Sequence, residues 1–235
     1  MIYKKILFLT FWLIALIGCG NTQTEKSDKN FKNYFFQPEW FKEPKIYEYE
    51  TLNKANGEKS IVYRYFEKID NKKLKVIIYD KDFNQSVIII YEYLPDKVII
   101  NNITTVETWN ENKLVMEKLT DNVVFDYKKM NKDFGFTHTT RSKNETGITK
   151  FVIRSLRKTD TQEFNDEEVN VVIASGRTKI VFDRDNMTIN SDEKLVYAEN
   201  IGVIYQEFII QNNKGVTNLS KILTKDEFEK MKNAR

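Results

Sequence analysis

Short runs of β-branched and aromatic residues, separated by Asn, Asp, Gly and Lys, recur from residue 45 to residue 223 and most constrain how this chain can fold. The runs favour extended backbone, and the residues between them, such as Asn56-Gly57 and Asn213-Lys214-Gly215, favour hairpin turns. We therefore expect an antiparallel meander of strands. The runs predict strands at residues 45–52, 60–69, 74–79, 86–94, 97–109, 114–119, 123–127, 135–140, 148–156, 169–174, 178–182, 195–198, 202–211 and 216–223.

Several of these predicted strands carry apolar residues on both faces. In the strand at 86–94, Ile89 lies on one face and Ile88 on the other, and the strand at 74–79 around Ile78 has the same pattern. A sheet with one face in water would alternate apolar and polar residues. Two-sided apolarity therefore predicts a sandwich or a strongly curved half-barrel. We expect its interior to be filled by side chains. The alternative is a hollow that holds a hydrophobic ligand against Ile78 and Ile89.

One short helix is expected at the C-terminus, at residues 225–233, because Thr224 and Glu227 have the spacing of a capping box. A chain of 235 residues with 41% hydrophobic residues, including 16 Phe, fits a single domain with a large core. We therefore predict one all-β domain over residues 34–235. It should be an antiparallel meander that forms a curved half-barrel or sandwich, with a short C-terminal helix.

The N-terminal segment has the layout of a cleaved secretory signal. Lys4 and Lys5 precede an apolar run of 13 residues, from 6 to 18, which is shorter than the roughly 20 residues that span a bilayer. The run ends in Leu16-Ile17-Gly18-Cys19, which resembles the lipobox of bacterial lipoproteins. The resemblance implies cleavage of residues 1–18 and lipid attachment to Cys19, the only cysteine. The polar residues 19–33 then form a flexible tether. The alternative is an ordinary secretory signal with a free Cys19 thiol.

Two further segments resemble the opening and closing motifs of uncharacterised β-rich secreted bacterial lipoproteins. They are Tyr34-Phe35-Phe36-Gln37-Pro38 ahead of Tyr47-Glu48-Tyr49, and Tyr197-Ala198-Glu199-Asn200-Ile201-Gly202-Val203 near the end. Those proteins are similar in outline to the half-barrel of lipoprotein-localisation factors. The resemblance implies a curved antiparallel sheet with a ligand-facing hollow, and it implies no catalysis. This chain departs from the motif at Asn200, where those proteins more often have Gly.

The sequence carries little of the chemistry that catalysis or metal binding needs. His138 is the only histidine, no Gly-x-Ser-x-Gly motif is present, and the body after Cys19 has no cysteine for a thiolate site. Asp80-Lys81-Asp82-Phe83-Asn84 matches the first ligand positions of an EF-hand loop, but Gln85 and Tyr91 replace its turn glycine and its bidentate glutamate. We interpret this segment as a hairpin turn. We expect no metal, no cofactor and no enzymatic activity.

The charge balance argues against a nucleic-acid partner. The formal net charge is +3, and it falls to +1 once Lys4 and Lys5 are removed with the signal. Acidic and basic residues also alternate finely along the chain, as in Lys225-Asp226-Glu227. A protein that binds nucleic acid needs a basic patch to neutralise phosphates.

The densest aromatic cluster in the chain is Phe35, Phe36, Trp40 and Phe41. We expect Trp40 and Phe41 to fasten the first segment of the domain onto the core. The alternative is an exposed patch that contacts a partner or the membrane surface.

These observations predict a non-enzymatic lipoprotein of the cell envelope, anchored in the membrane by the lipid on Cys19. It would bind a lipid or an acyl chain in a hollow of the curved sheet. The second prediction is a protein-binding or immunity-type envelope module that uses strand edges and the region of Trp40. The third is a hydrolase with carboxylates that the sequence does not single out. In enteric bacteria an aspartate directly after the lipidated cysteine resembles the signal that retains lipoproteins in the inner membrane. This chain has Gly20 at that position, so we expect the protein at the outer membrane if the cell has two membranes.

Overall fold

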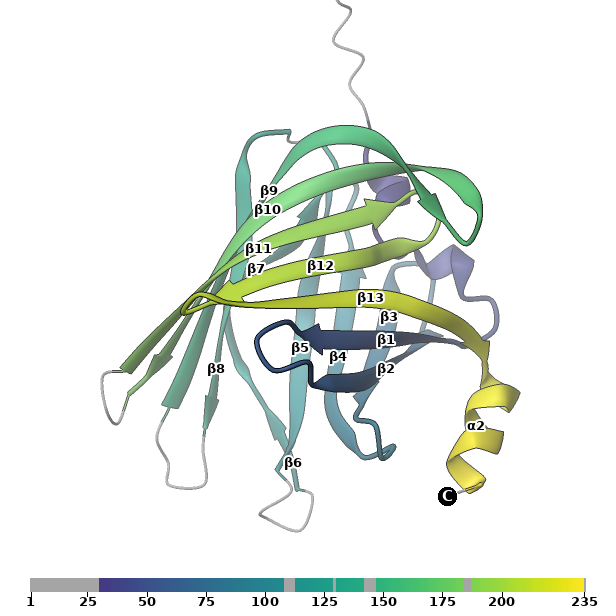
Figure 1. The fold of residues 1–235 in the computed structure, drawn as a ribbon, viewed down its shortest axis with the longest axis horizontal. Coiled ribbons are helices and arrows are strands. Elements are labelled where there is room, and N and C mark those ends of the chain that lie inside the picture. The colour runs from purple at the N-terminus through teal and green to yellow at the C-terminus, as the bar shows by residue number, and fades with distance from the viewer. Residues whose placement is uncertain (1–29, 108–112, 129, 142–146, 184–186, 235) are drawn as a thin grey trace, which may run out of the picture.

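The computed structural model describes residues 30–107, 113–128, 130–141, 147–183 and 187–234. These residues form strands, two short 3-10 helices and one α-helix (Figure 1). The helices are η1 (Lys32–Tyr34), η2 (Pro38–Trp40) and α2 (Lys225–Asn233). The strands are β1 (Lys45–Asn53), β2 (Lys59–Lys68), β3 (Lys73–Tyr79), β4 (Gln85–Tyr93), β5 (Lys97–Glu107), β6 (Lys113–Met116), β7 (Lys118–Asp126), β8 (Asp133–Arg141), β9 (Gly147–Phe164), β10 (Glu167–Phe182), β11 (Met187–Ala198), β12 (Gly202–Ile210) and β13 (Asn213–Thr224).

The strands form one closed antiparallel barrel (Figure 1). Consecutive strands pair along the meander, except that β7 pairs with β5 and not with β6. β1 also pairs with β13, from Lys45 opposite Thr224 to Asn53 opposite Gly215. The ring has twelve strands, with the short β6 as an addition beside β5. The all-β meander is confirmed, but the predicted half-barrel or sandwich is wrong. The reason is that the first and last strands hydrogen-bond to each other and leave no open side.

The predicted strands match closely in the first half of the barrel and less well in the second. The predicted strands at 169–174 and 178–182 are one continuous strand, β10, and β9 extends to Phe164 through a polar stretch. A two-residue turn joins the end of β9 to the start of β10, and its residues Asn165 and Asp166 have φ of 52° and 63°. The turn before β13 is formed by Gln211 and Asn212, with φ of 48° and 70°, and not by residues 213–215 as predicted. Two successive left-handed residues are typical of a tight hairpin.

The two-sided apolarity of the early strands has a different cause on each face. The inward face belongs to the barrel interior, where residues such as Phe66 and Val76 join the main core. The outward face forms a smaller cluster, in which Tyr63 and Ile77 pack beneath Phe228 of α2. The capping box of α2 is confirmed, because the Glu227 N–H donates to Thr224 Oγ1 and the Thr224 N–H donates to a Glu227 carboxylate oxygen.

An N-terminal plug, which we define as residues 31–41, closes one end of the barrel (Figure 1). The Phe35 ring contacts Phe125 of β7, at 5.2 Å between centroids, and the Phe36 ring contacts Phe66 of β2, at 4.4 Å. Gln37 is buried, and its Nε2 donates to the carbonyl oxygens of Lys32 and Phe35, so it holds the plug in shape.

The predicted boundaries at the N-terminus are corrected in one respect. The signal segment, the lipobox and Cys19 lie outside the described residues. The tether was expected to end at residue 33, but Phe31 is already buried and its N–H donates to the Tyr127 carbonyl at 2.9 Å. The packed chain therefore begins by residue 31. None of the helices in the described part of the chain is long and apolar enough to cross a membrane.

The two segments that resemble lipoprotein motifs meet at the plug. The Asn200 N–H donates to the Asn33 carbonyl at 2.7 Å. Asn200 has φ of 61°, a left-handed conformation that asparagine tolerates, so the turn forms without the glycine of the motif. Gly202 has φ of 96°, and a Cβ on it would lie 2.4 Å from the Phe36 ring.

Replacing Gly202 by alanine should therefore lower the free energy of unfolding by about 3 kcal/mol or more, because backbone strain adds to displacement of the buried Phe36 ring. Gly57→Ala is the matched control, since Gly57 has φ of 73° but a Cβ added to it would meet no atom within 4 Å. The control should lose only about 1 kcal/mol. Urea unfolding followed by tryptophan fluorescence measures both, and equal losses would contradict the importance of the Phe36 contact.

Candidate functional site

A cavity of about 320 Å³ lies inside the barrel, between the plug and the far end. Phe36 bounds it on the plug side, and strands on opposite sides of the barrel supply its walls. Small-molecule sites usually fall between about 300 and 1,000 Å³. The interior is therefore filled only in part: side chains pack the end beside the plug, and the hollow that we kept as the alternative is present beyond Phe36. Ile78 and Ile89 line it, as that alternative expected, while ligand binding itself stays a prediction.

One wall of the cavity is apolar and is built by neighbouring strands in register. Phe66, Val76, Ile89 and Ile103 pair across β2, β3, β4 and β5 and form the row beside the plug. The next row, farther from the plug, is Arg64, Ile78, Val87 and Thr105 on the same strands. Val87 and Ile89 stay partly exposed although they point inward, so other side chains do not cover this part of the cavity surface, whereas Phe66, Val76 and Ile103 are buried.

The opposite wall carries charged and polar groups from β8, β9, β11 and β12. Arg154 Nη2 lies 3.3 Å from Glu193 Oε2, and the Thr178 hydroxyl donates to the other carboxylate oxygen. Gly176 lies between Arg154 and Glu193 in the register of β9, β10 and β11. A Cβ on Gly176 would lie 3.0 Å from Arg154 Cγ. The missing side chain thus gives Arg154 the room to reach Glu193.

Arg64 has no comparable acidic partner. Its guanidinium lies over the Tyr49 ring, 4.5 Å from the ring centroid, and the Tyr49 hydroxyl is fixed by donating to the Val203 carbonyl at 2.9 Å. Arg64 Nε is buried without a hydrogen-bond partner, and within the described ranges Arg64 makes no ion pair. A cation held on an aromatic face keeps its N–H donors free to bind an anion.

The charges on the cavity wall do not balance. Arg64, Lys150 and Arg154 are cationic and Glu193 is the one carboxylate, so the lining residues carry two positive charges in excess when His138 is neutral. Burial lowers the pKa of Lys150, Glu193 acts in the opposite direction, and Arg154 and Arg64 lower it again. The charged groups therefore act on one another across the cavity.

His138 lies at the end of the cavity away from the plug, opposite Lys150 in the β8–β9 register. Its Nδ1 is 3.8 Å from Glu117 Oε2, and the Thr105 hydroxyl donates to Glu117 Oε1 at 2.6 Å. Burial acts to raise the pKa of Glu117, but the nearby His138 and the hydroxyl groups of Thr105 and Thr140 outweigh burial and lower this pKa. At 3.8 Å the carboxylate is close enough to act on the imidazole electrostatically but too far to hydrogen-bond to it, and both facing atoms are buried without a hydrogen-bond partner. The residues that line the cavity include no serine or cysteine.

The other predicted site residues lie outside the cavity. Phe41 is 1% exposed and stacks on Phe66, with 4.9 Å between ring centroids, so the alternative in which it contacts a partner is wrong. Trp40 is half-buried against the main core. Asp80 closes a tight turn by accepting from the Asp82 and Asn84 N–H groups. Among the residues that the structure describes, no group of three or more His, Cys, Asp or Glu side chains could hold a metal ion.

Sequence reasoning did not single out the charged lining residues Arg64, Lys150, Arg154 and Glu193. A signal for two of them was present. Arg64 shares an inward face with Phe66, and Arg154 shares one with Val152, because alternate residues of a strand point the same way. A charge on an otherwise apolar inward face is unusual, but the sequence alone does not say which face of these strands points inward.

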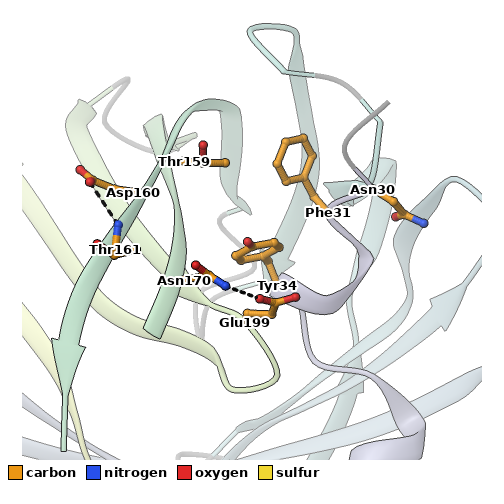
Figure 2. Close-up of a pocket in the computed structure, with 8 residues that line it drawn as sticks. All are labelled: Asn30, Phe31, Tyr34, Thr159, Asp160, Thr161, Asn170 and Glu199. Atoms are coloured by element: carbon orange, nitrogen blue, oxygen red, sulfur yellow. Dashed lines mark hydrogen bonds between the residues drawn. The ribbon is translucent and has the colours of Figure 1, made fainter. Parts of the chain in front are cut away.

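A second hollow, of about 610 Å³, lies on the outer surface where the plug meets β9 and β10 (Figure 2). Its polar groups pair with each other: Asn170 Nδ2 donates to Glu199 Oε2 at 2.9 Å, and the Thr161 N–H donates to Asp160 at 3.1 Å. Burial, and then the nearby Glu199, raise the pKa of Tyr34. Phe31 and Tyr34 of the plug form one side of this groove, and its polar groups are already paired, so we regard the interior cavity as the better candidate site.

Comparisons with known proteins identify the fold. No protein-family model and no curated protein matches this sequence. A protein assigned as a lipoprotein from Parabacteroides distasonis ATCC 8503 is similar in structure, with TM-score 0.55, 11% identity and coverage of 81% of this chain and 98% of that chain. An exported protein with a YmcC-like fold from Bacteroides fragilis NCTC 9343 has TM-score 0.50, 12% identity and coverage of 77% and 95%. At these identities the likeness shows a shared fold and nothing further.

The buried Tyr49 beneath Arg64 predicts a loss of stability at alkaline pH. Burial raises its pKa to about 12, although Arg64 acts to lower it, and Tyr91 and Tyr197 raise it further. A raised pKa means that folding favours the neutral phenol. The stabilisation is complete below pH 10, where an unfolded tyrosine is also neutral, and roughly 2 kcal/mol is lost as the pH rises from 10 to 12.

Urea unfolding at pH 8 and pH 11 checks this, and Tyr49→Phe should show a smaller fall between the two. Tyrosinate absorbance of the folded protein, compared between the wild type and Tyr49→Phe, gives the ionisation directly. Titration of Tyr49 near pH 10 in the folded protein would contradict the burial argument.

Proposed function

We propose that this protein is a lipid-anchored lipoprotein of the bacterial cell envelope that binds a hydrophobic ligand inside its barrel and acts by binding, without catalysis. The observation that carries the proposal is the cavity of about 320 Å³ with an apolar wall formed by β2 to β5. Removing apolar surface from water stabilises the complex by roughly 25 cal/mol per Å², so partly exposed apolar side chains inside the barrel favour the binding of an apolar ligand.

Two features of the cavity support binding over catalysis. Glu193, the one carboxylate on its wall, is engaged by Arg154 and Thr178, so it is not free to act as a general base. His138 has a carboxylate neighbour, Glu117, but the residues that line the cavity include no serine or cysteine that it could activate. A ligand held mainly by apolar contacts is therefore the simpler use of this site.

The proposed location rests on the sequence and on the fold. The segment Leu16-Ile17-Gly18-Cys19 resembles a lipobox, and the two structures of the same fold are a protein assigned as a lipoprotein and an exported protein. Phe31 is already packed against the barrel, so about a dozen residues lie between Cys19 and the first buried residue. In a cell with two membranes, Gly20 next to Cys19 favours the outer membrane.

Narrowing the cavity should weaken ligand binding without unfolding the barrel. N-phenylnaphthylamine, a neutral probe whose fluorescence rises in apolar surroundings, should bind the wild-type chain from Gly20 onward. Ile89→Phe should weaken this binding about tenfold, because the larger side chain occupies ligand space. Ile90→Phe is the matched control, since Ile90 pairs with Lys75 and Asn102 and does not line the cavity.

Circular dichroism establishes that both variants are folded. Absence of probe binding to the folded wild type, or equal loss in the two variants, would refute ligand binding in the cavity.

Replacing Cys19 by serine should abolish attachment of the lipid anchor. A lipobox cysteine is the attachment point for the acyl chains, and a hydroxyl cannot form the thioether. We expect the wild type in the membrane fraction and Cys19→Ser either as unprocessed precursor or in the soluble envelope fraction. Radiolabelled palmitate incorporation measures the lipid itself, and a labelled Cys19→Ser protein would show that the lipid is attached elsewhere.

A further inference from the structure

We propose that the ligand is a single-chain amphiphile with an anionic head group, such as a fatty acid, whose head binds Arg64 and Lys150 and whose chain lies along the apolar rows. This inference rests on the proposed function and narrows it to a chemical class. A cavity built only for a neutral chain would not need cations on its wall. Here cationic and apolar groups line the same hollow.

Arg64 is the strongest part of the argument. Its guanidinium lies over the Tyr49 ring, and the hydroxyl of that tyrosine donates a hydrogen bond to the Val203 carbonyl. The guanidinium is thus positioned before any ligand arrives, while its buried Nε has no partner. Leaving a charged donor unsatisfied is costly, and an anionic head group would remove that cost with charge-assisted hydrogen bonds.

The other charges show why an anion would be bound at Arg64 and Lys150 and not at Arg154. Arg154 already faces Glu193 at 3.3 Å, with Gly176 giving it space. Lys150 has no ion pair within 4.0 Å among the described residues, although Glu193 lies within electrostatic range. The only carboxylate on the cavity wall, Glu193, is therefore paired with only one of the three cationic side chains. An anionic ligand would supply part of the missing negative charge.

The strand register gives the ligand a direction. The row that contains Phe66 and Ile89 lies against the plug, because Phe66 packs on Phe36. The row that contains Arg64 lies one step farther from the plug, and Lys150 lies opposite His138 at the far end. A ligand that enters from the far end would place its chain against the plug and leave its head group at the cations.

The test compares three amphiphiles with the same chain and different head groups: dodecanoate, dodecanol and dodecyltrimethylammonium. Each displaces bound N-phenylnaphthylamine from the chain from Gly20 onward, below its micelle concentration. This part of the chain contains the closed ring and its own core. Dodecanoate should bind about tenfold more tightly than dodecanol, and dodecyltrimethylammonium should bind most weakly, because like charges repel.

Arg64→Gln should weaken dodecanoate binding about tenfold and leave dodecanol binding within about twofold. Arg177→Gln is the matched control, because Arg177 is 86% exposed on the outer face of β10 and should change neither affinity. Lys150→Gln repeats the test should Arg64→Gln fail to fold, as judged by circular dichroism.

The outcomes separate this inference from the proposed function. Equal affinities for dodecanoate and dodecanol, a preference for the cationic amphiphile, or an equal loss of both ligands in Arg64→Gln would overturn the anionic ligand. Hydrophobic binding would survive each of those results. Failure of the neutral probe to bind at all would overturn both.

Discussion

The pairing of β1 with β13 is the interaction on which the rest of the structure depends. It joins strands from opposite ends of the chain, with Lys45 opposite Thr224, and it turns an open meander into a ring. Without it, both strands would expose unpaired backbone N–H and C=O groups along an edge. Closure also determines the inside of the molecule, because alternate residues of every strand must then point into the barrel.

The size of the ring explains both the plug and the cavity. An eight-stranded barrel is just wide enough for its own side chains to fill, and the diameter grows with the number of strands. A ring of twelve strands therefore needs additional material inside. Phe35 and Phe36 of the plug supply it at one end, where they pack on Phe125 and Phe66. Among the described residues, no comparable segment fills the barrel from the end opposite the plug. The cavity next to Phe36 therefore stays open.

Local sequence predicted what depends on local physics. Strand positions, the capping box at Thr224 and Glu227, and the two-sided apolarity around Ile78 and Ile89 follow from propensity and periodicity. Closure did not follow, because nothing in Lys45 or Thr224 indicates that strands so far apart in sequence pair with each other. The charged side of the cavity was missed for the same reason. Arg154 and Glu193 become partners only once β9, β10 and β11 are in register.

The electrostatics of the cavity connect the fold to the proposed ligand. Burying an unpaired charge is expensive, so interiors usually pair cations with carboxylates or place them in water. In this interior Arg154 is paired with the carboxylate of Glu193. Arg64 has no carboxylate partner and lies over the ring of Tyr49. Mutual repulsion among Arg64, Lys150 and Arg154 would be relieved by one negative charge in the cavity. The cavity has excess positive charge without a ligand, and a bound anion would balance part of it. This difference would make the site selective for an anionic head group, and the neighbouring apolar rows would select for its chain.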